Sequence, residues 1–93
     1  MKLGYARVST ADQDLRLQRQ RLKEVGCEKL FEEKASGARK RRPELDKLLA
    51  ELRRDDVLVV TRLDRLARST SELLRIAEAI EEKNAGLQSL AEP

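Results

Sequence analysis

The sequence predicts a three-layer α/β domain with a mainly parallel four-stranded sheet and the element order βαβαβαβ. Its 93 residues are enough for one domain, and no linker or internal repeat divides them. Short apolar segments alternate with segments of helical periodicity, a pattern typical of parallel strands joined by right-handed crossovers. The segment Asp56–Thr61 has four consecutive apolar residues, three of them valine, which indicates a strand covered on both faces.

Two strands and one helix are predicted in the first third of the chain. Lys2–Val8 mixes apolar and polar residues over a short span and is predicted to be a strand that ends in a turn. Ala11–Val25 is predicted to be a helix because apolar residues recur along it at helical spacing and Gly26 follows as a stop. Lys29–Glu33 is predicted to be a second strand.

Two further helices and two strands are predicted in the rest of the chain. Pro43 suits the first turn of a helix, whose apolar face is formed by the leucines at positions 45, 48, 49 and 52. The strand Asp56–Thr61 follows. Ser69 and Glu72 have the spacing of a capping box that opens the next helix. That helix ends near Asn84, and Leu87–Leu90 is predicted to be the fourth strand.

The composition excludes several kinds of site. The chain has no histidine, so the commonest general base and the commonest zinc ligand are both missing. Its single cysteine, Cys27, excludes an internal disulfide and a thiolate cluster. Tyr5 and Phe31 are the two aromatic residues, too few for stacking along single-stranded nucleic acid.

Charge is distributed unevenly along the chain. The sequence has 20 Lys and Arg against 17 Asp and Glu, but Lys34–Arg42 carries five positive charges and no acid. The last segment, Ile76–Pro93, carries four glutamates against one lysine. No apolar run approaches the ~20 residues of a membrane span, and the N-terminus does not resemble a signal peptide. A cytoplasmic protein that does not bind membranes is therefore expected.

The candidate site lies where the predicted strands end. Ligands of open parallel sheets bind beyond the carboxyl ends of the strands. Three connections leave those ends: the turn after Val8, the segment Lys34–Arg42 and the segment Thr61–Ser69. Together they hold the potential nucleophile Ser9, the carboxylate of Asp64 and the arginines Arg7, Arg39, Arg41, Arg42, Arg62, Arg65 and Arg68.

This set of side chains fits phosphoryl chemistry without a metal. Arginine stays charged and bridges two phosphate oxygens with its planar fork. Several arginines would stabilise the extra negative charge of a pentacoordinate phosphoryl transition state. Ser9 is a weak nucleophile until its proton is removed. Asp64, an arginine or water are the candidates for that role, and the residues do not choose among them.

Each of these features also has a simpler interpretation. Ser9 could cap the first helix, and the bases of Lys34–Arg42 could form a solvated loop or a nonspecific patch for polyanions. Asp64 could form a local salt bridge with Arg65 or Arg68. Gln18 falls on the apolar stripe of the first helix, so it either lies at the edge of that stripe or faces the site.

Three segments together resemble a known family. GYARVSTADQ near the start, FEEKASG in the middle and VVTRLDRLARS later are similar to the catalytic domain of the serine recombinases, the resolvase and invertase family of site-specific DNA recombinases. The resemblance runs in order over the whole chain, and the joint presence of the first and last segments is specific.

The resemblance implies roles for individual residues. Ser9 would attack a DNA phosphodiester, form a 5′-phosphoserine link and release a 3′-OH. Arg7, Arg65 and Arg68 would bind the scissile phosphate, and Asp64 would orient an arginine or the nucleophile. Further residues of the site would be Gln18 and Arg42 near the phosphate, and Glu33 as an acid that orders the site. Arg39, Lys40 and Arg41 match no fixed catalytic position of the family and are expected to be ordinary contacts to the DNA backbone.

The resemblance also implies the partners. The family needs no metal and no nucleotide cofactor, binds double-stranded DNA, and acts as dimers that form tetramers. Residues 1–93 would be the catalytic domain of a truncated recombinase that lacks the dimerisation helix and the C-terminal DNA-binding domain. Such a fragment is expected to be inactive or weakly active, and to be monomeric or to pair in a non-native way.

Two alternatives stay open. Within the family, the residues do not separate a resolvase from an invertase or a large serine integrase, although a motif that begins at Met1 disfavours transposases whose DNA-binding domain comes first. Outside the enzyme class, the same pattern would suit a βαβ regulatory module that binds anions or partners.

Overall fold

The computed structural model describes residues 1–9, 15–35 and 42–91. They contain a four-stranded sheet in the order β2-β1-β3-β4, and every neighbouring pair is parallel. The strands are β1 (Lys2–Ser9), β2 (Cys27–Ala35), β3 (Val57–Val60) and β4 (Gly86–Ser89). The predicted α/β class and the four parallel strands are confirmed.

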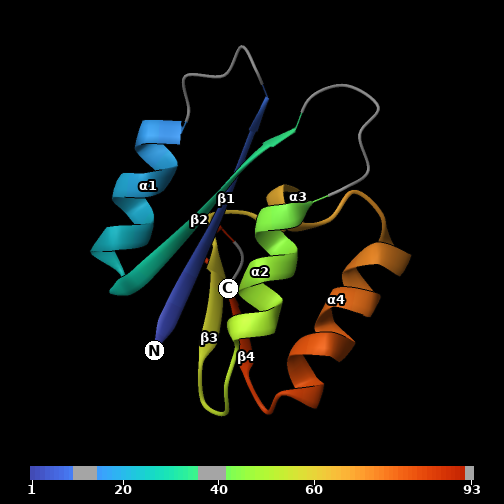
Figure 1. Cartoon of the computed structure of the whole chain (residues 1–93). Coiled ribbons are helices and arrows are strands. Elements are labelled where there is room, and N and C mark those ends of the chain that lie inside the picture. Colours follow the sequence, from blue (N-terminus) through green and yellow to red (C-terminus); the bar gives the residue numbers. More distant parts are fainter. Residues whose placement is uncertain (10–14, 36–41, 92–93) are drawn as a thin grey trace.

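Helices cover both faces of this sheet. Figure 1 shows α1 on one side, and α2 and α4 on the other. The helices are α1 (Leu15–Glu24), α2 (Pro43–Glu51), α3 (Leu63–Leu66) and α4 (Thr70–Glu82). Within the described residues, no helix is both long enough and apolar enough to cross a membrane.

The two faces of the sheet bury different amounts of apolar surface. The larger cluster joins Leu48 of α2 and Ile76 of α4 to strand residues that include Tyr5 and Val60. The smaller cluster, under α1, is built around Ala6, Leu22 and Val59. Gly4 allows a close approach on this face, because a Cβ there would lie 2.8 Å from Leu30 Cδ2 and 3.2 Å from Leu22 Cδ1.

The strand register creates a step at the carboxyl end of the sheet. Pairing between β1 and β3 ends at Tyr5 and Val60, whereas pairing between β1 and β2 continues to Ser9 and Ala35. The last four residues of β1 therefore extend past the end of β3. The helix α3 packs against β1, so it lies beside this step.

The short helix α3 is the element that the sequence did not predict. It lies within Thr61–Ser69, which was expected to be a loop. A single turn is too short for periodicity to reveal. Leu66 is fully buried, and the amide of Ala67 donates to the carbonyl oxygen of Leu63 over 3.0 Å. Burial of this leucine therefore accounts for the turn.

The start of α4 has one of the two hydrogen bonds of the predicted capping box. The amide of Glu72 donates to Ser69 Oγ over 3.2 Å, as a capping serine requires. The Glu72 carboxylate accepts instead from the amide of Arg68, over 3.4 Å. Glu72 also binds a residue from another helix, and this contact belongs to the site.

Candidate active site

The carbonyl group of Arg7 joins three elements at the carboxyl end of β1. Gln18 of α1 donates to its oxygen from Nε2 over 3.3 Å, and Arg65 of α3 donates from Nη1 over 3.4 Å. Gln18 is almost fully buried. It therefore faces the sheet beside the predicted site and does not lie at an exposed edge of α1. Three residues that the resemblance assigned to one site converge on one atom.

The side chain of Arg7 is a buried positive charge. It is 8% exposed, and its guanidinium donates no hydrogen bond to any residue within the described ranges. Burial lowers the pKa of Arg7, and the nearby positive charges of Arg42 and Arg68 lower it further. Burial of an unpaired charge among like charges is unfavourable, and a bound anion would relieve this cost.

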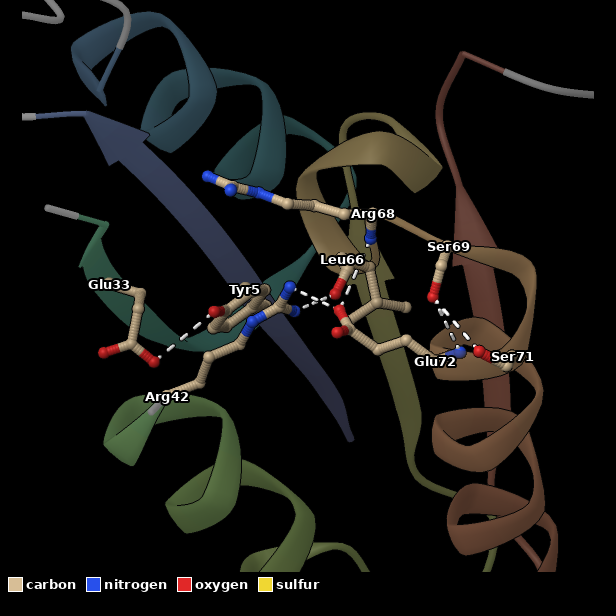
Figure 2. Close-up of polar contacts among 8 residues, drawn as sticks. All are labelled: Tyr5, Glu33, Arg42, Leu66, Arg68, Ser69, Ser71 and Glu72. Atoms are coloured by element: carbon tan, nitrogen blue, oxygen red, sulfur yellow. Dashed lines mark hydrogen bonds and ion pairs between the residues drawn. The ribbon is translucent and has the colours of Figure 1, made fainter. Parts of the chain in front are cut away.

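Arg42 reaches from the start of α2 to the end of α3 and the first turn of α4. Its guanidinium donates to the carbonyl oxygen of Leu66 and to the carboxylate of Glu72 (Figure 2). The side chain of Arg42 is only 12% exposed. Arg42 thus joins α2 to α3 and α4, and Glu72, which the sequence predicted only as part of a capping box, is a further residue of the site.

Glu33 holds the start of α2 against the sheet. Its Oε1 accepts from the amides of Glu44 and Leu45, over 3.0 and 3.2 Å, and from the Tyr5 hydroxyl over 3.4 Å (Figure 2). The N-cap residue Arg42 makes no side-chain cap of its own, so this carboxylate from β2 satisfies the first amides of the helix. Glu33 thereby fixes the backbone from which Arg42 projects.

Tyr5 lies beside these charged groups, but its hydroxyl is not suited to act as a general base. Its side chain is fully buried. Burial raises the pKa of Tyr5 above its usual range, and the negative charge of Glu33 raises it further. The hydroxyl therefore stays protonated near neutral pH and acts as a hydrogen-bond donor.

Asp64 lies apart from the buried cluster. It occupies the first turn of α3, its side chain is 61% exposed, and it pairs with Arg62 over 2.9 Å. The simpler interpretation of a salt bridge with Arg65 or Arg68 was therefore wrong in its partner. Arg62 is the adjacent cation because it immediately precedes α3 and is exposed on the same turn.

The structure places the remaining candidates only in part. Ser9 is the last residue of β1, paired with Ala35, and its side chain lies outside the described part of the chain. Strand geometry puts its Cα about 7 Å from that of Arg7, two residues earlier. Arg39, Lys40 and Arg41 also lie outside the described residues.

The arrangement is suited to binding an anion between arginines. Arg42 and Arg68 are close enough to Arg7 to lower its pKa, and Arg65 donates to the carbonyl oxygen of Arg7. Among residues 1–9, 15–35 and 42–91, no three His, Cys, Asp or Glu side chains group to hold a metal ion.

Comparison with known proteins assigns the chain to a family. Residues 2–93 match the family described as the resolvase N-terminal domain. The chain belongs to the resolvase family of serine recombinases. It is 45% identical over 92 residues to the transposon Tn552 DNA-invertase BinR of Staphylococcus aureus, covering 99% of this chain and 48% of that protein. It is 46% identical over 90 residues to the transposon Tn917 resolvase of Enterococcus faecalis, covering 97% of this chain and 49% of that protein.

The likeness extends to solved structures. The C-terminal catalytic domain of ISC1926 TnpA, an IS607-like serine recombinase, superposes with a TM-score of 0.79 at 26% identity, covering 96% of this chain and 69% of that one. The resemblance found in the sequence is thus confirmed at the level of family and fold. The chain spans about half the length of these two curated relatives.

Proposed function

We propose that residues 1–93 are the catalytic domain of a site-specific DNA recombinase in which Ser9 is the nucleophile. The observation that supports this most directly is the junction at the carbonyl of Arg7. It gathers Gln18 and Arg65 two residues before Ser9. Arg7 itself is a buried arginine with no acceptor among the described residues, and a guanidinium of this kind suits the binding of a phosphate.

The proposed reaction is a reversible phosphoryl transfer. Ser9 Oγ loses its proton and attacks a phosphodiester of double-stranded DNA. A Ser9–phosphorus bond forms, the bond to the 3′ oxygen breaks, and that oxygen takes up a proton to become a free 3′-OH. After strand exchange, a 3′-OH attacks the phosphoserine and restores the phosphodiester, so no external energy source is needed.

The arginines supply the electrostatic part of this reaction. Arg7, Arg65 and Arg68 bind the scissile phosphate and stabilise the charge that develops on its oxygens. Arg42 contributes from the start of α2, and Arg39 and Arg41 contact the DNA backbone. Asp64 orients an arginine or the nucleophile. Tyr5 is excluded as the base because its pKa is raised, so Asp64, an arginine or water receives the proton of Ser9.

The working protein extends beyond this domain. The relatives are about twice as long as the chain. We infer that other segments provide the dimerisation helix and a C-terminal DNA-binding domain, and that dimers assemble into tetramers on DNA. The protein acts in the cytoplasm, where its DNA substrate is found.

A covalent adduct with DNA tests the proposal. Residues 2–93 are grafted in place of the matching region of the Tn917 resolvase and given the site of that resolvase in a nicked, suicide form. We expect a protein–DNA adduct that survives denaturation and is lost in Ser9→Ala. Ser71→Ala, an exposed serine on α4, serves as the control and keeps the adduct. An adduct that survives Ser9→Ala, in a folded chimera, contradicts the role of Ser9.

A second candidate is a module that binds anions without chemistry. The burial of Arg7 among like charges favours it, because anion binding alone would relieve that cost. The same chimera distinguishes the two functions. Such a module would bind DNA or phosphate with unchanged affinity in Ser9→Ala, and it would form no adduct in any variant.

A further inference from the structure

Glu72 occupies the place at Arg42 where an anionic ligand would be expected. Both terminal nitrogens of the Arg42 guanidinium already donate to protein oxygens, one to the Leu66 carbonyl and one to the Glu72 carboxylate. These are the two nitrogens with which an arginine forms a bidentate, end-on contact with a phosphate. The ion pair joins residues 30 positions apart and is largely shielded from water, with side chains 12% and 27% exposed.

Glu72 also offsets the repulsion within the arginine cluster. The charges of Arg42 and Arg68 lower the pKa of Arg7, whereas the charge of Glu72 raises it. In the described part of the chain, Glu72 is the carboxylate that pairs with an arginine of this cluster, and it also accepts from the Arg68 amide over 3.4 Å. One carboxylate thus contacts both the α2 side and the α3–α4 side of the site (Figure 2).

We propose that the Glu72 carboxylate occupies the position of a DNA phosphate at Arg42 and competes with that phosphate for the guanidinium. Without DNA, the carboxylate holds Arg42 in place and lowers the mutual repulsion of the arginines. When a phosphate enters, Arg42 transfers from the carboxylate to the phosphate oxygens. This inference rests on the proposed function for the identity of the ligand, while the competition itself is a property of any phosphate at this site.

The surroundings of the pair allow this exchange. Arg42 and Glu72 line a groove of about 410 Å³ between α2 and α4, and Arg75 lines the same groove. Arg75 follows Glu72 by three residues on α4, a spacing at which opposite charges on a helix interact. The carboxylate that Arg42 leaves can therefore pair with Arg75, so the release of Arg42 leaves no unpaired charge behind.

The alternative role for Glu72 is positioning. In that case the carboxylate would orient Arg42 for the phosphate and remain bound to it throughout. The two roles predict opposite effects of removing the charge. Loss of a competitor strengthens phosphate binding, whereas loss of a positioning group weakens it.

Titration of the 93-residue chain with inorganic phosphate, at constant ionic strength, distinguishes these roles. Calorimetry on the wild type, Glu72→Gln and the control Glu78→Gln gives the affinities, and Glu78 is exposed on the same helix. We expect Glu72→Gln to bind phosphate about five-fold more tightly, a typical size for coupling between competing contacts. The control should match the wild type.

Two further variants keep the test decisive. The gain should disappear in Arg42→Met/Glu72→Gln, because the competition acts through Arg42. If Glu72→Gln does not fold, Glu72→Asp, which retains the charge but shortens the side chain, should show a smaller gain in affinity. Unchanged or weaker binding in a folded variant overturns the proposal. Because no covalent step is measured, this result is independent of the adduct assay for Ser9.

Discussion

The two ends of the sheet use charge in different ways. At the amino end, charges pair one to one near the surface: the Met1 ammonium with Asp56 over 3.2 Å, and Lys29 with Glu51 over 2.7 Å. At the carboxyl end, Arg7 is buried without an acceptor among the described residues, and the one carboxylate bound to Arg42 lies close to several arginines. The pairs at the first end satisfy each other, whereas the buried Arg7 at the second end lies among other arginines.

This difference separates ion pairs that stabilise the fold from charges that are suited to binding an anion. Exposed pairs such as Lys29–Glu51 contribute about 0–1 kcal/mol and have no need of a ligand. A buried arginine near like charges destabilises the folded state unless an anion binds it. Perturbed charges of this kind concentrate at functional sites. The contrast locates the proposed anion-binding end of the sheet without reference to a relative.

The sharpest test of this contrast is to remove the buried charge. In the Tn917 chimera, Arg7→Met should reduce the rate of cleavage by on the order of 100-fold or more, because a cation facing the transition state is lost. Its free energy of unfolding should stay within about 1 kcal/mol of the wild type or rise, since a buried charge is replaced by an apolar side chain of similar length.

Cleavage kinetics and urea unfolding measure the two effects separately. Arg54→Met, an exposed arginine in the turn before β3, is the matched control and should change neither. A large loss of stability in Arg7→Met, with a parallel loss of cleavage, would show that Arg7 is a structural residue.

Carboxylates at the two ends should differ in their effect on stability. Glu33→Ala leaves the amides of Glu44 and Leu45 without their acceptor, so the free energy of unfolding should fall by about 2–4 kcal/mol. Glu51→Ala removes an exposed partner of Lys29 and should cost less than about 1 kcal/mol. Urea denaturation of both variants measures the difference, and equal losses would remove the distinction between the two ends.

The smallest expected effect is the pH dependence of stability that arises from Asp56 at the amino end of the sheet. The amide of Arg53 donates to Asp56 and, with the Met1 ammonium, lowers the pKa of Asp56. A lowered pKa in the folded state means that the ionised group stabilises the fold above the unfolded pKa of about 4, and that this contribution is lost as the pH falls.

Asp56→Asn should therefore lower the Tm at pH 7, and the two proteins should converge near pH 2–3. Thermal unfolding across that range measures the effect. The control is Glu82→Gln, an exposed carboxylate of α4, which should follow the wild type at every pH. A constant Tm difference between the wild type and Asp56→Asn would contradict the assignment of the effect to ionisation.

Much of this architecture followed from local sequence. The strand Val57–Val60 was evident from its run of apolar residues, and the start of α2 from Pro43 and the leucines after it. These signals depend on residues close together in the chain. The boundaries moved where neighbouring strands decide them: β2 runs from Cys27 to Ala35, longer than predicted, because β1 pairs along its full length.

The candidate site divides in the same way. Sequence alone predicted that Arg7, Arg42, Arg65 and Arg68 would lie at the carboxyl end, because a parallel sheet brings all its strand ends to one edge. Arg39 and Arg41, predicted at the same edge, lie outside the described residues. It did not predict that Gln18 would bind the carbonyl of Arg7. It left Asp64 with the wrong partner, since the choice among Arg62, Arg65 and Arg68 depends on how one turn of helix is oriented.

The sequence by itself determined the order of the elements other than α3, the family and the residue types available for chemistry. Only the tertiary structure decided that Glu33 would cap α2 from β2, and that Glu72 would pair with Arg42 across 30 residues. The physical reason is that propensity and periodicity act over a few neighbouring residues. Contacts between distant residues depend on strand register and helix packing, which form only when the whole domain folds.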